Sequence, residues 1–331
     1  MTKIILHVGM GKTGTTSIQT AFLNSREALM QKGVDYLGLS FDMLDQNFRG
    51  NAGLQRLART TPEDMRRQGE IMAAELTKRA ATRGTEKFVF SNEAAFGHCK
   101  ALAPFIAELR RDFDVSVILY VRNPKNWLPS AYNQWGINHK TYKGPIQPFN
   151  ELGRKLVMTY RALQDWHALH SDILTVRLFK KSMNIVEDFC STTGIELEVT
   201  NLRTYERIEP AESVLHAMFN NQFATPVLPS HFEKSVKRKN LSSTPKLEQI
   251  LKDSFSYDDI DTIVKERERL FTFVKDTFGL DLFEEPQEPT KVLDPTDIRN
   301  RLVDYMLTLV MQQAERISQL EDAVAAMNRK A

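Results

Sequence analysis

Residues 4–17 of the chain are IILHVGMGKTGTTS. A short apolar run leads into three glycines, Gly9, Gly11 and Gly14, with Lys12 between the last two. Glycines let a backbone approach an anion closely, and the free N–H groups at the start of a following helix point toward it. Lys12 adds a mobile positive charge. The stretch therefore predicts a first strand, a phosphate-binding turn and an amphipathic helix.

Three interpretations of this turn are open on spacing. Gly9, Gly11 and Gly14 satisfy the G-x-G-x-x-G pattern of dinucleotide-binding folds, and Asp35 follows at about the interval of a ribose-binding acid. In that use, however, a lysine inside the turn has no task. A triphosphate-binding loop needs a glycine five residues before Gly11, where Leu6 stands instead. The third interpretation is a turn that binds nothing.

Further apolar runs of strand length follow along the first 200 residues, with segments of helical spacing between them. The strand-like runs are residues 4–8, 34–39, 88–90, 115–121 and 173–178, and the longest helix-like segments are residues 62–83 and 149–170. This alternation predicts an α/β fold with a doubly wound, mostly parallel sheet of about five strands.

Beyond residue 200 the strand signals stop. We expect a core at residues 1–200, a helical extension at 201–290 that completes the core and its cleft, and one long helix within 291–331. In that helix, a spacing of seven aligns two columns of side chains. They are Val303, Val310, Ile317 and Val324 in one column, and Met306, Gln313, Leu320 and Met327 in the other. The helix either forms a coiled-coil homodimer or packs against its own chain.

Composition limits the class of partner. The 331 residues carry 44 Lys+Arg against 42 Asp+Glu, a net charge of +2, which gives no general attraction to nucleic acid or to an anionic membrane. No apolar run is long enough to span a membrane, and no signal-peptide core is present. The two cysteines, Cys99 and Cys190, indicate buried thiols in a reducing, cytoplasmic protein, and no metal site is expected.

A second informative stretch is residues 117–132, VILYVRNPKNWLPSAY. The strand ends in Arg122, Asn123 can cap the next turn, and Pro124 suits a first helical position. The planar guanidinium of Arg122 can hold a phosphate through two hydrogen bonds, and Ser130 can add a hydroxyl. Taken alone, Arg-Asn-Pro is also a common surface turn. Pro129 is expected to kink the helix that carries Ser130.

Together, the K-x-G-T-T run and the downstream R-N-P…S-x-Y run resemble the two donor-binding motifs of sulfotransferases that use 3′-phosphoadenosine 5′-phosphosulfate (PAPS). The resemblance covers residues 3–195. It implies that the 5′-phosphosulfate is bound by Gly11, Lys12, Thr13, Gly14, Thr15, Thr16 and Ser17. It also implies that Arg122 and Ser130 bind the 3′-phosphate, over which Lys237 and Arg238 of a late basic run would close.

A sulfotransferase needs a base that takes the proton of the acceptor hydroxyl. Glu93, directly after the run at 88–90, resembles the catalytic carboxylate of carbohydrate sulfotransferases. His98 is the alternative, since imidazole titrates near neutral pH. Glu93 could also be a carboxylate that merely favours a helix start. Lys12 is expected to stabilise charge on the leaving group.

The resemblance thus implies a PAPS-dependent enzyme with the P-loop nucleotide-binding fold, which transfers sulfate to a hydroxyl of a carbohydrate or glycolipid. A P-loop kinase, a nicotinamide oxidoreductase and a non-catalytic nucleotide- or glycan-binding module are the alternatives. The kinase interpretation is disfavoured because Leu6 stands where its phosphate-binding loop needs a glycine. The oxidoreductase interpretation is disfavoured because it gives Lys12 no role.

Overall fold

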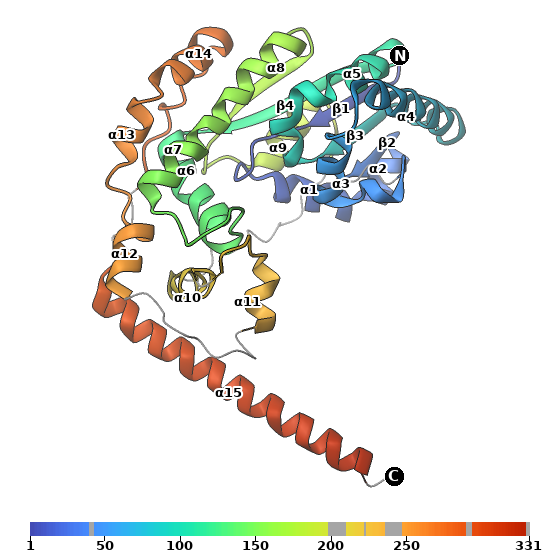
Figure 1. Cartoon of the computed structure of the whole chain (residues 1–331). Helices are drawn as coiled ribbons and strands as arrows, with labels where there is room; N and C mark the ends of the chain where they lie inside the picture. The colour runs from blue at the N-terminus through green and yellow to red at the C-terminus, as the bar shows by residue number, and fades with distance from the viewer. Residues whose placement is uncertain (40–42, 198–209, 222, 236–246, 289–292, 329–331) are drawn as a thin grey trace. The chain divides into compact units, whose positions relative to one another are not determined.

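The computed structural model describes the chain except residues 40–42, 198–209, 222, 236–246, 289–292 and 329–331 (Figure 1). It forms two compact units. The sheet unit comprises Met1–Trp127, Val157–Tyr205 and Val264–Gln287, and the helical unit comprises Leu128–Leu156, Glu206–Ile263 and Glu288–Ala331. Each unit collects segments that are far apart in sequence.

The sheet unit contains a five-stranded, fully parallel sheet in the order β2-β3-β1-β4-β5. Its strands are β1 (Lys3–His7), β2 (Val34–Gly38), β3 (Lys87–Ser91), β4 (Asp114–Arg122) and β5 (Leu174–Phe179). The doubly wound α/β class predicted from the sequence is confirmed, and each strand overlaps one of the five predicted runs.

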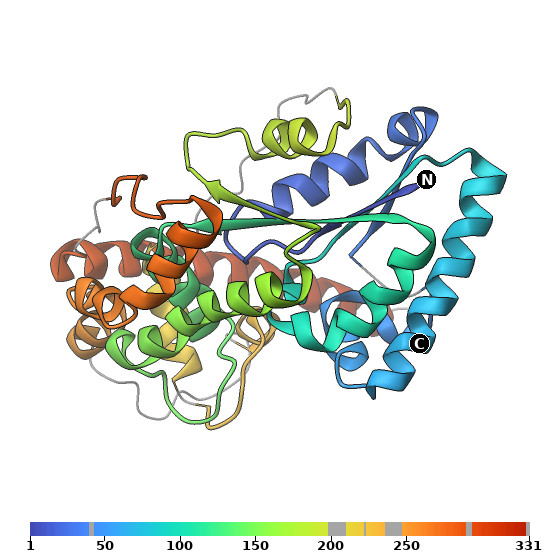
Figure 2. The ribbon, with the colours of Figure 1, turned by 90° about the horizontal axis from the view of Figure 1, so that it is seen from above.

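Helices cover both faces of this sheet (Figure 2). On one face lie α1 (Thr15–Asn24), α2 (Arg26–Gln31) and α9 (Ile185–Thr193), and on the other lie α4 (Pro62–Arg83), α5 (Cys99–Asp112) and α8 (Ala162–His170). Side chains alternate along β1 accordingly. Ile5 packs in the cluster that contains Phe22 and Phe189, whereas Leu6 and Val8 pack toward α5 and α8.

The direction of the crossovers explains where a ligand site can form. The chain leaves β1 toward β2 on one side, whereas it leaves β3 toward β4 on the opposite side. Because parallel crossovers are right-handed, the two connections place their helices on opposite faces of the sheet. The carboxyl end of β1 is therefore a topological switch point, the place where open α/β sheets bind ligands.

Local signals explain the helix limits where the prediction succeeded and where it failed. Thr61 caps α4 by accepting a hydrogen bond from the Asp64 N–H at 3.1 Å, and Gly84 ends the helix with φ +65°. The predicted helix at 62–83 is thus confirmed. The segment 149–170 is instead split into α7 (Phe149–Leu156), a 3₁₀ turn (Val157–Arg161) and α8. Within the break, the Tyr160 hydroxyl donates to the Arg122 carbonyl at 2.5 Å.

The remaining elements are helices and helical turns, and those after residue 200 agree with the helical extension that the sequence predicted. They are the 3₁₀ turns Gln46–Phe48 and Glu93–His98, α3 (Gly50–Leu57), α6 (Pro124–Tyr132), a π turn (Asn133–Asn138), α10 (Pro210–Asn220), α11 (Pro229–Ser235), α12 (Leu247–Phe255), α13 (Ile260–Lys265), α14 (Glu268–Phe278) and α15 (Pro295–Asn328). None of the described helices combines the length and hydrophobicity needed to cross a bilayer.

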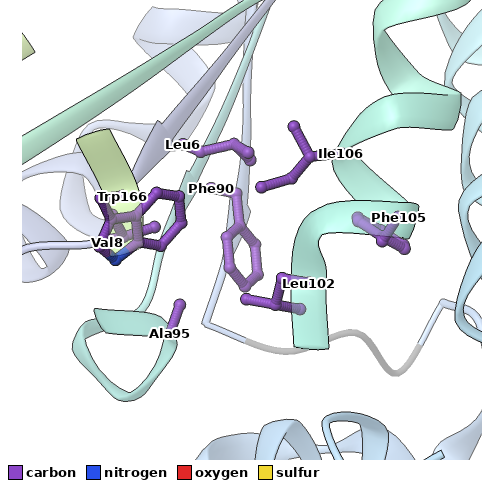
Figure 3. A pocket seen from close by; sticks show the side chains of 8 residues that line it. All are labelled: Leu6, Val8, Phe90, Ala95, Leu102, Phe105, Ile106 and Trp166. Carbon is purple, nitrogen blue, oxygen red and sulfur yellow. The ribbon is translucent and has the colours of Figure 1, made fainter. Parts of the chain in front are cut away.

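The face of the sheet that packs on α5 and α8 leaves a void of about 10 Å³ (Figure 3). Its lining is entirely hydrophobic: Leu6, Val8, Phe90, Ala95, Leu102, Phe105, Ile106 and Trp166. A void of this size and character is a packing imperfection of the core, since water or a polar ligand would find no partner there.

Leu102→Ala enlarges this void, and we expect it to lower the free energy of unfolding by about 2 to 5 kcal/mol. Leu169→Ala is the matched control, because Leu169 is 44% exposed and its truncation should cost about 0.5 kcal/mol or less. Urea unfolding of both variants measures the difference. Equal losses would contradict the placement of Leu102 in the core.

Candidate functional site

The glycine-rich turn follows β1 and is tied to β4 and α6. The N–H groups of Val8 and Met10 donate to the carbonyls of Ile118 and Tyr120 at 3.0 and 3.1 Å, which prolongs the β1–β4 ladder into the turn. The fully buried indole of Trp127 donates to the Gly11 carbonyl at 2.8 Å. The two stretches that the sequence singled out, 4–17 and 117–132, therefore meet at the carboxyl edge of the sheet.

The backbone of the turn has the geometry of an anion-binding nest. Lys12 and Gly14 adopt left-handed conformations, with φ +67° and +81°, and Thr13 between them has a negative φ. Alternation of hand directs successive N–H groups toward one point. Gly14 is also the N-cap of α1, and as a glycine it offers no side chain to the first-turn N–H groups. The turn thus presents backbone donors to an anion.

Thr15 adds a side-chain donor to this turn. The residue is 4% exposed, and its Oγ1 has no hydrogen-bond partner among the described residues. A buried hydroxyl without a partner is costly, because it has lost its hydrogen bonds to water. A bound phosphate or sulfate oxygen would satisfy it.

Two glycines of the turn are required by their surroundings. A Cβ on Gly9 would lie 2.8 Å from His7 Nε2. A Cβ on Gly14 would lie 3.1 Å from Ile185 Cγ2, in addition to the unfavourable φ. The turn is therefore pressed against the end of β1 and against α9, and these contacts hold its shape.

Glu93 stands at the end of the neighbouring strand β3. The fully buried Asn92 precedes it, and its Oδ1 accepts from the Ala94 N–H at 2.9 Å while its Nδ2 donates to the Leu39 carbonyl at 2.8 Å. The Asn92 N–H donates to the His7 carbonyl at 3.0 Å. Glu93 is thus the first residue after a rigidly held strand end beside the turn.

Gln19, on α1, holds the Glu93 carboxylate. Its Nε2 donates to Glu93 Oε2 at 3.0 Å and to the Ser91 carbonyl at 3.2 Å. The helix that begins at the glycine-rich turn therefore fixes the position of the carboxylate.

Lys12 and Glu93 act on each other electrostatically. The Lys12 side chain reaches solvent, but nearby atoms remove part of the water around its ammonium group and lower its pKa, while the charge of Glu93 raises it. The pKa of Tyr36, a buried residue of β2, is raised by burial first and by Glu93 second. A cation, a carboxylate and a phenol therefore share one edge of the sheet.

Arg122 ends β4 and is 7% exposed, with its guanidinium 5.5 Å from the centre of the Phe179 ring. Asn123 caps the next turn as predicted, by accepting from the Lys125 N–H at 2.9 Å, and α6 begins at Pro124. The Asn123 side chain also donates to the Glu285 carbonyl at 2.7 Å. The guanidinium is thus held among apolar and polar neighbours at the same edge as the turn.

The structure ties the other predicted site residues less closely to the turn and to Glu93. Thr16 is exposed, and the Ser17 N–H donates to the Gly14 carbonyl at 2.9 Å. Ser130 is half-buried on the part of α6 that belongs to the helical unit, and Lys237 and Arg238 lie outside the described residues. His98 ends the 3₁₀ turn that Glu93 begins. Burial and the charge of Arg59 lower the pKa of His98.

The structure does not support Asp35 as the ribose-binding acid that the dinucleotide interpretation requires. Asp35 is fully buried near the start of β2, where its carboxylate lies 3.4 Å from Arg83 and 3.8 Å from Arg79, both on α4. It is therefore part of the core ion pairs and not a ribose ligand. No cluster of three or more metal-binding side chains occurs in the part of the chain that the structure describes.

Four contributions to the site escaped the sequence analysis: Gln19, Tyr36, Trp127 and Glu285. Gln19 stands four residues after Thr15, one helical turn along α1, and that spacing was a usable signal. Glu285 had none. Its carboxylate accepts from the Lys181 N–H at 2.9 Å and from the Asn126 side chain at 3.3 Å, across more than 100 positions of sequence.

Comparison with known proteins gives the fold some context. No protein-family model and no curated protein matches the sequence. Among solved structures, the chain is similar to a sulfotransferase domain from the curacin biosynthetic pathway, with 12% identity and a TM-score of 0.34 over 81% of this chain and 98% of that chain. A likeness this low says nothing about activity, which must be argued from the site.

His7 lies beneath the turn and is fully buried. Its Nδ1 is 2.8 Å from Ser91 Oγ, and its ring packs against Tyr120 and Phe189. Burial lowers the pKa of His7 from its ordinary 6.5 to about 3. Between these values the unfolded chain binds a proton here that the folded protein does not, so stability falls as the pH drops from 6.5 toward 3.

We therefore expect His7→Asn to unfold with a shallower pH dependence between pH 6 and pH 4 than the wild type, by up to about 1.4 kcal/mol per pH unit. Denaturant unfolding at several pH values measures the slope. The exposed His231→Asn should keep the wild-type slope. Identical slopes in His7→Asn and the wild type would show that His7 is not buried in its neutral form.

Proposed function

We propose that this protein is a sulfotransferase that takes a sulfuryl group from PAPS and transfers it to the hydroxyl of a carbohydrate or glycolipid. The observation that carries the proposal is the placement of Lys12, in a nest-like turn after β1, at the same sheet edge as Glu93, which follows the adjacent strand β3 and acts on Lys12 electrostatically. A cation aimed at an anion, beside a general base, is what transfer between two oxygen atoms requires.

The residues of the turn fit the 5′-phosphosulfate end of the donor. The alternating backbone at residues 12–14 offers N–H donors, and the Thr15 hydroxyl awaits an acceptor. Arg122, at the end of the adjacent strand β4, is assigned to the 3′-phosphate, since a guanidinium can bind it with two hydrogen bonds. Ser130, Lys237 and Arg238 are assigned to the same phosphate by the family resemblance.

The proposed transfer is one step, in which Glu93 and Lys12 have separate roles. Glu93 accepts the proton of the acceptor hydroxyl while the acceptor oxygen bonds to sulfur. The bond from sulfur to the bridging phosphate oxygen breaks, and Lys12 stabilises the charge that develops on that oxygen. Gln19 holds the Glu93 carboxylate in place for this step through its hydrogen bond to Oε2.

Glu93 is a better supported base than His98. Lys12 and Glu93 interact, whereas the charge that acts on the pKa of His98 is that of Arg59. A carboxylate base is the feature that, through the family resemblance, favours carbohydrate acceptors. The proposal for the acceptor class therefore depends on Glu93.

The donor assignment predicts that 3′-phosphoadenosine 5′-phosphate raises the melting temperature, while ATP with magnesium or NAD does not. Thr15→Val should weaken the bisphosphate about 10-fold or more, because it removes a hydrogen bond to a charged group. Thermal shift titration measures both effects.

Thr85→Val is the matched control, because Thr85 is 3% exposed and its hydroxyl also has no partner among the described residues. It precedes β3, at the opposite edge of the sheet. Both variants lose a costly buried hydroxyl, so the unliganded proteins should remain folded. A response to ATP or NAD alone, or equal weakening by both variants, would contradict the donor assignment.

Glu93→Gln should reduce turnover about 10²- to 10⁴-fold, the usual contribution of a general base, while bisphosphate affinity persists. Sulfate transfer from labelled PAPS to a panel of glycans and glycolipids measures turnover. The exposed Glu27→Gln on α2 is the control and should keep wild-type activity. If the wild type binds the bisphosphate but transfers sulfate to nothing, a binding module replaces the enzyme as the conclusion.

A further inference from the structure

The long helix α15 carries a continuous stripe of exposed hydrophobic side chains. Its members are each 53% to 70% exposed: Val303, Met306, Leu307, Val310, Met311, Ile317 and Leu320. Soluble proteins rarely leave so large an apolar strip facing water. The stripe spans 17 residue steps, roughly 26 Å of helix at 1.5 Å per residue.

Among the side chains of α15 that the structure describes, the buried ones lie in the first turns of the helix. Ile298 and Leu302 are buried, the helix contacts α10 and α12, and Arg299 forms an ion pair with Glu248 of α12. The helix then continues as one uninterrupted element (Figure 1). Because its start is fixed and its helical form is already established, association of the stripe requires little further ordering.

The stripe has the spacing of a coiled-coil seam. Val303, Val310 and Ile317 recur every seven residues, and Met306 and Leu320 occupy the second column of the same repeat. In parallel coiled coils, β-branched residues in the first column with Leu in the second favour a two-stranded assembly. Gln313, the half-buried polar member of the second column, would fix the register at some cost in stability.

Charges beside the seam favour a second copy of this chain in the same direction. Arg316 precedes the Ile317 position, and Glu321 follows the Leu320 position; both are exposed. In a parallel, in-register pair, the residue before one first-column position faces the residue five places later on the partner helix. Arg316 of each chain would then meet Glu321 of the other, giving two opposite-charge pairs.

We infer that α15 is a self-association element, which joins two copies of this chain as a parallel, in-register coiled coil along Val303 to Glu321. This assignment is independent of the sulfotransferase proposal, since it concerns a helix with no part in the donor site. In this dimer the seam residues of each helix would be buried against the other helix, and Arg316 of each chain would pair with Glu321 of the other.

Sedimentation equilibrium of the full chain tests the inference. The wild type should be a dimer. Val310→Glu should raise the dimer dissociation constant about 100-fold or more, because each dimer would bury two unpaired carboxylates. Gln312→Glu, which adds the same charge two residues away at an exposed position off the seam, should leave the constant within about threefold. Circular dichroism confirms that both variants stay folded.

A charge exchange tests the orientation. Arg316→Glu should weaken the dimer about 10-fold, since it replaces two attractive pairs by two repulsive ones. Adding Glu321→Arg should restore the wild-type constant, which a parallel, in-register pair permits and an antiparallel pair does not. A monomeric wild type, a dimer indifferent to Val310→Glu, or a double variant as weak as Arg316→Glu would each overturn the inference.

Discussion

The site depends on the hydrogen bonding of β1 to a strand on each side. β3 and β4 pair with β1 in parallel, so His7 is in register with Ser91 and with Ile118. The segments that follow β1, β3 and β4 consequently leave the sheet at the same edge, the one formed by the carboxyl ends of the strands. The glycine-rich turn follows β1, Glu93 follows β3, and Arg122 ends β4. Lys12 and Glu93 are 81 positions apart in the sequence, and the pairing of β1 with β3 brings them to one edge of the sheet.

The turn itself is held in a strained conformation. A left-handed lysine costs about 1 to 2 kcal/mol, and the loop keeps it at Lys12 with φ +67°. Trp127 fixes the Gly11 carbonyl from one side, and His7 fills the space beneath Gly9. The core that surrounds the turn thus stabilises a backbone that an isolated peptide would not adopt, which is common where backbone donors must converge on an anion.

The same packing sets the electrostatics. Lys12 is partly desolvated, which alone would weaken its charge, and Glu93 opposes that effect. Gln19 couples the two, because it rises from the helix that begins at the turn and reaches the carboxylate on the neighbouring strand end.

The sequence by itself determined the strands, the helix at 62–83, the glycine-rich turn after β1 and the capped start of α6, because each follows from local periodicity, glycine conformation or capping. Tertiary structure decided the rest. The break at Val157–Arg161 follows the contact of Tyr160 with Arg122, Asp35 belongs to ion pairs with α4, and Glu285 binds residues more than 100 positions away. Such contacts depend on which surfaces meet after folding, and no local pattern of residues encodes that.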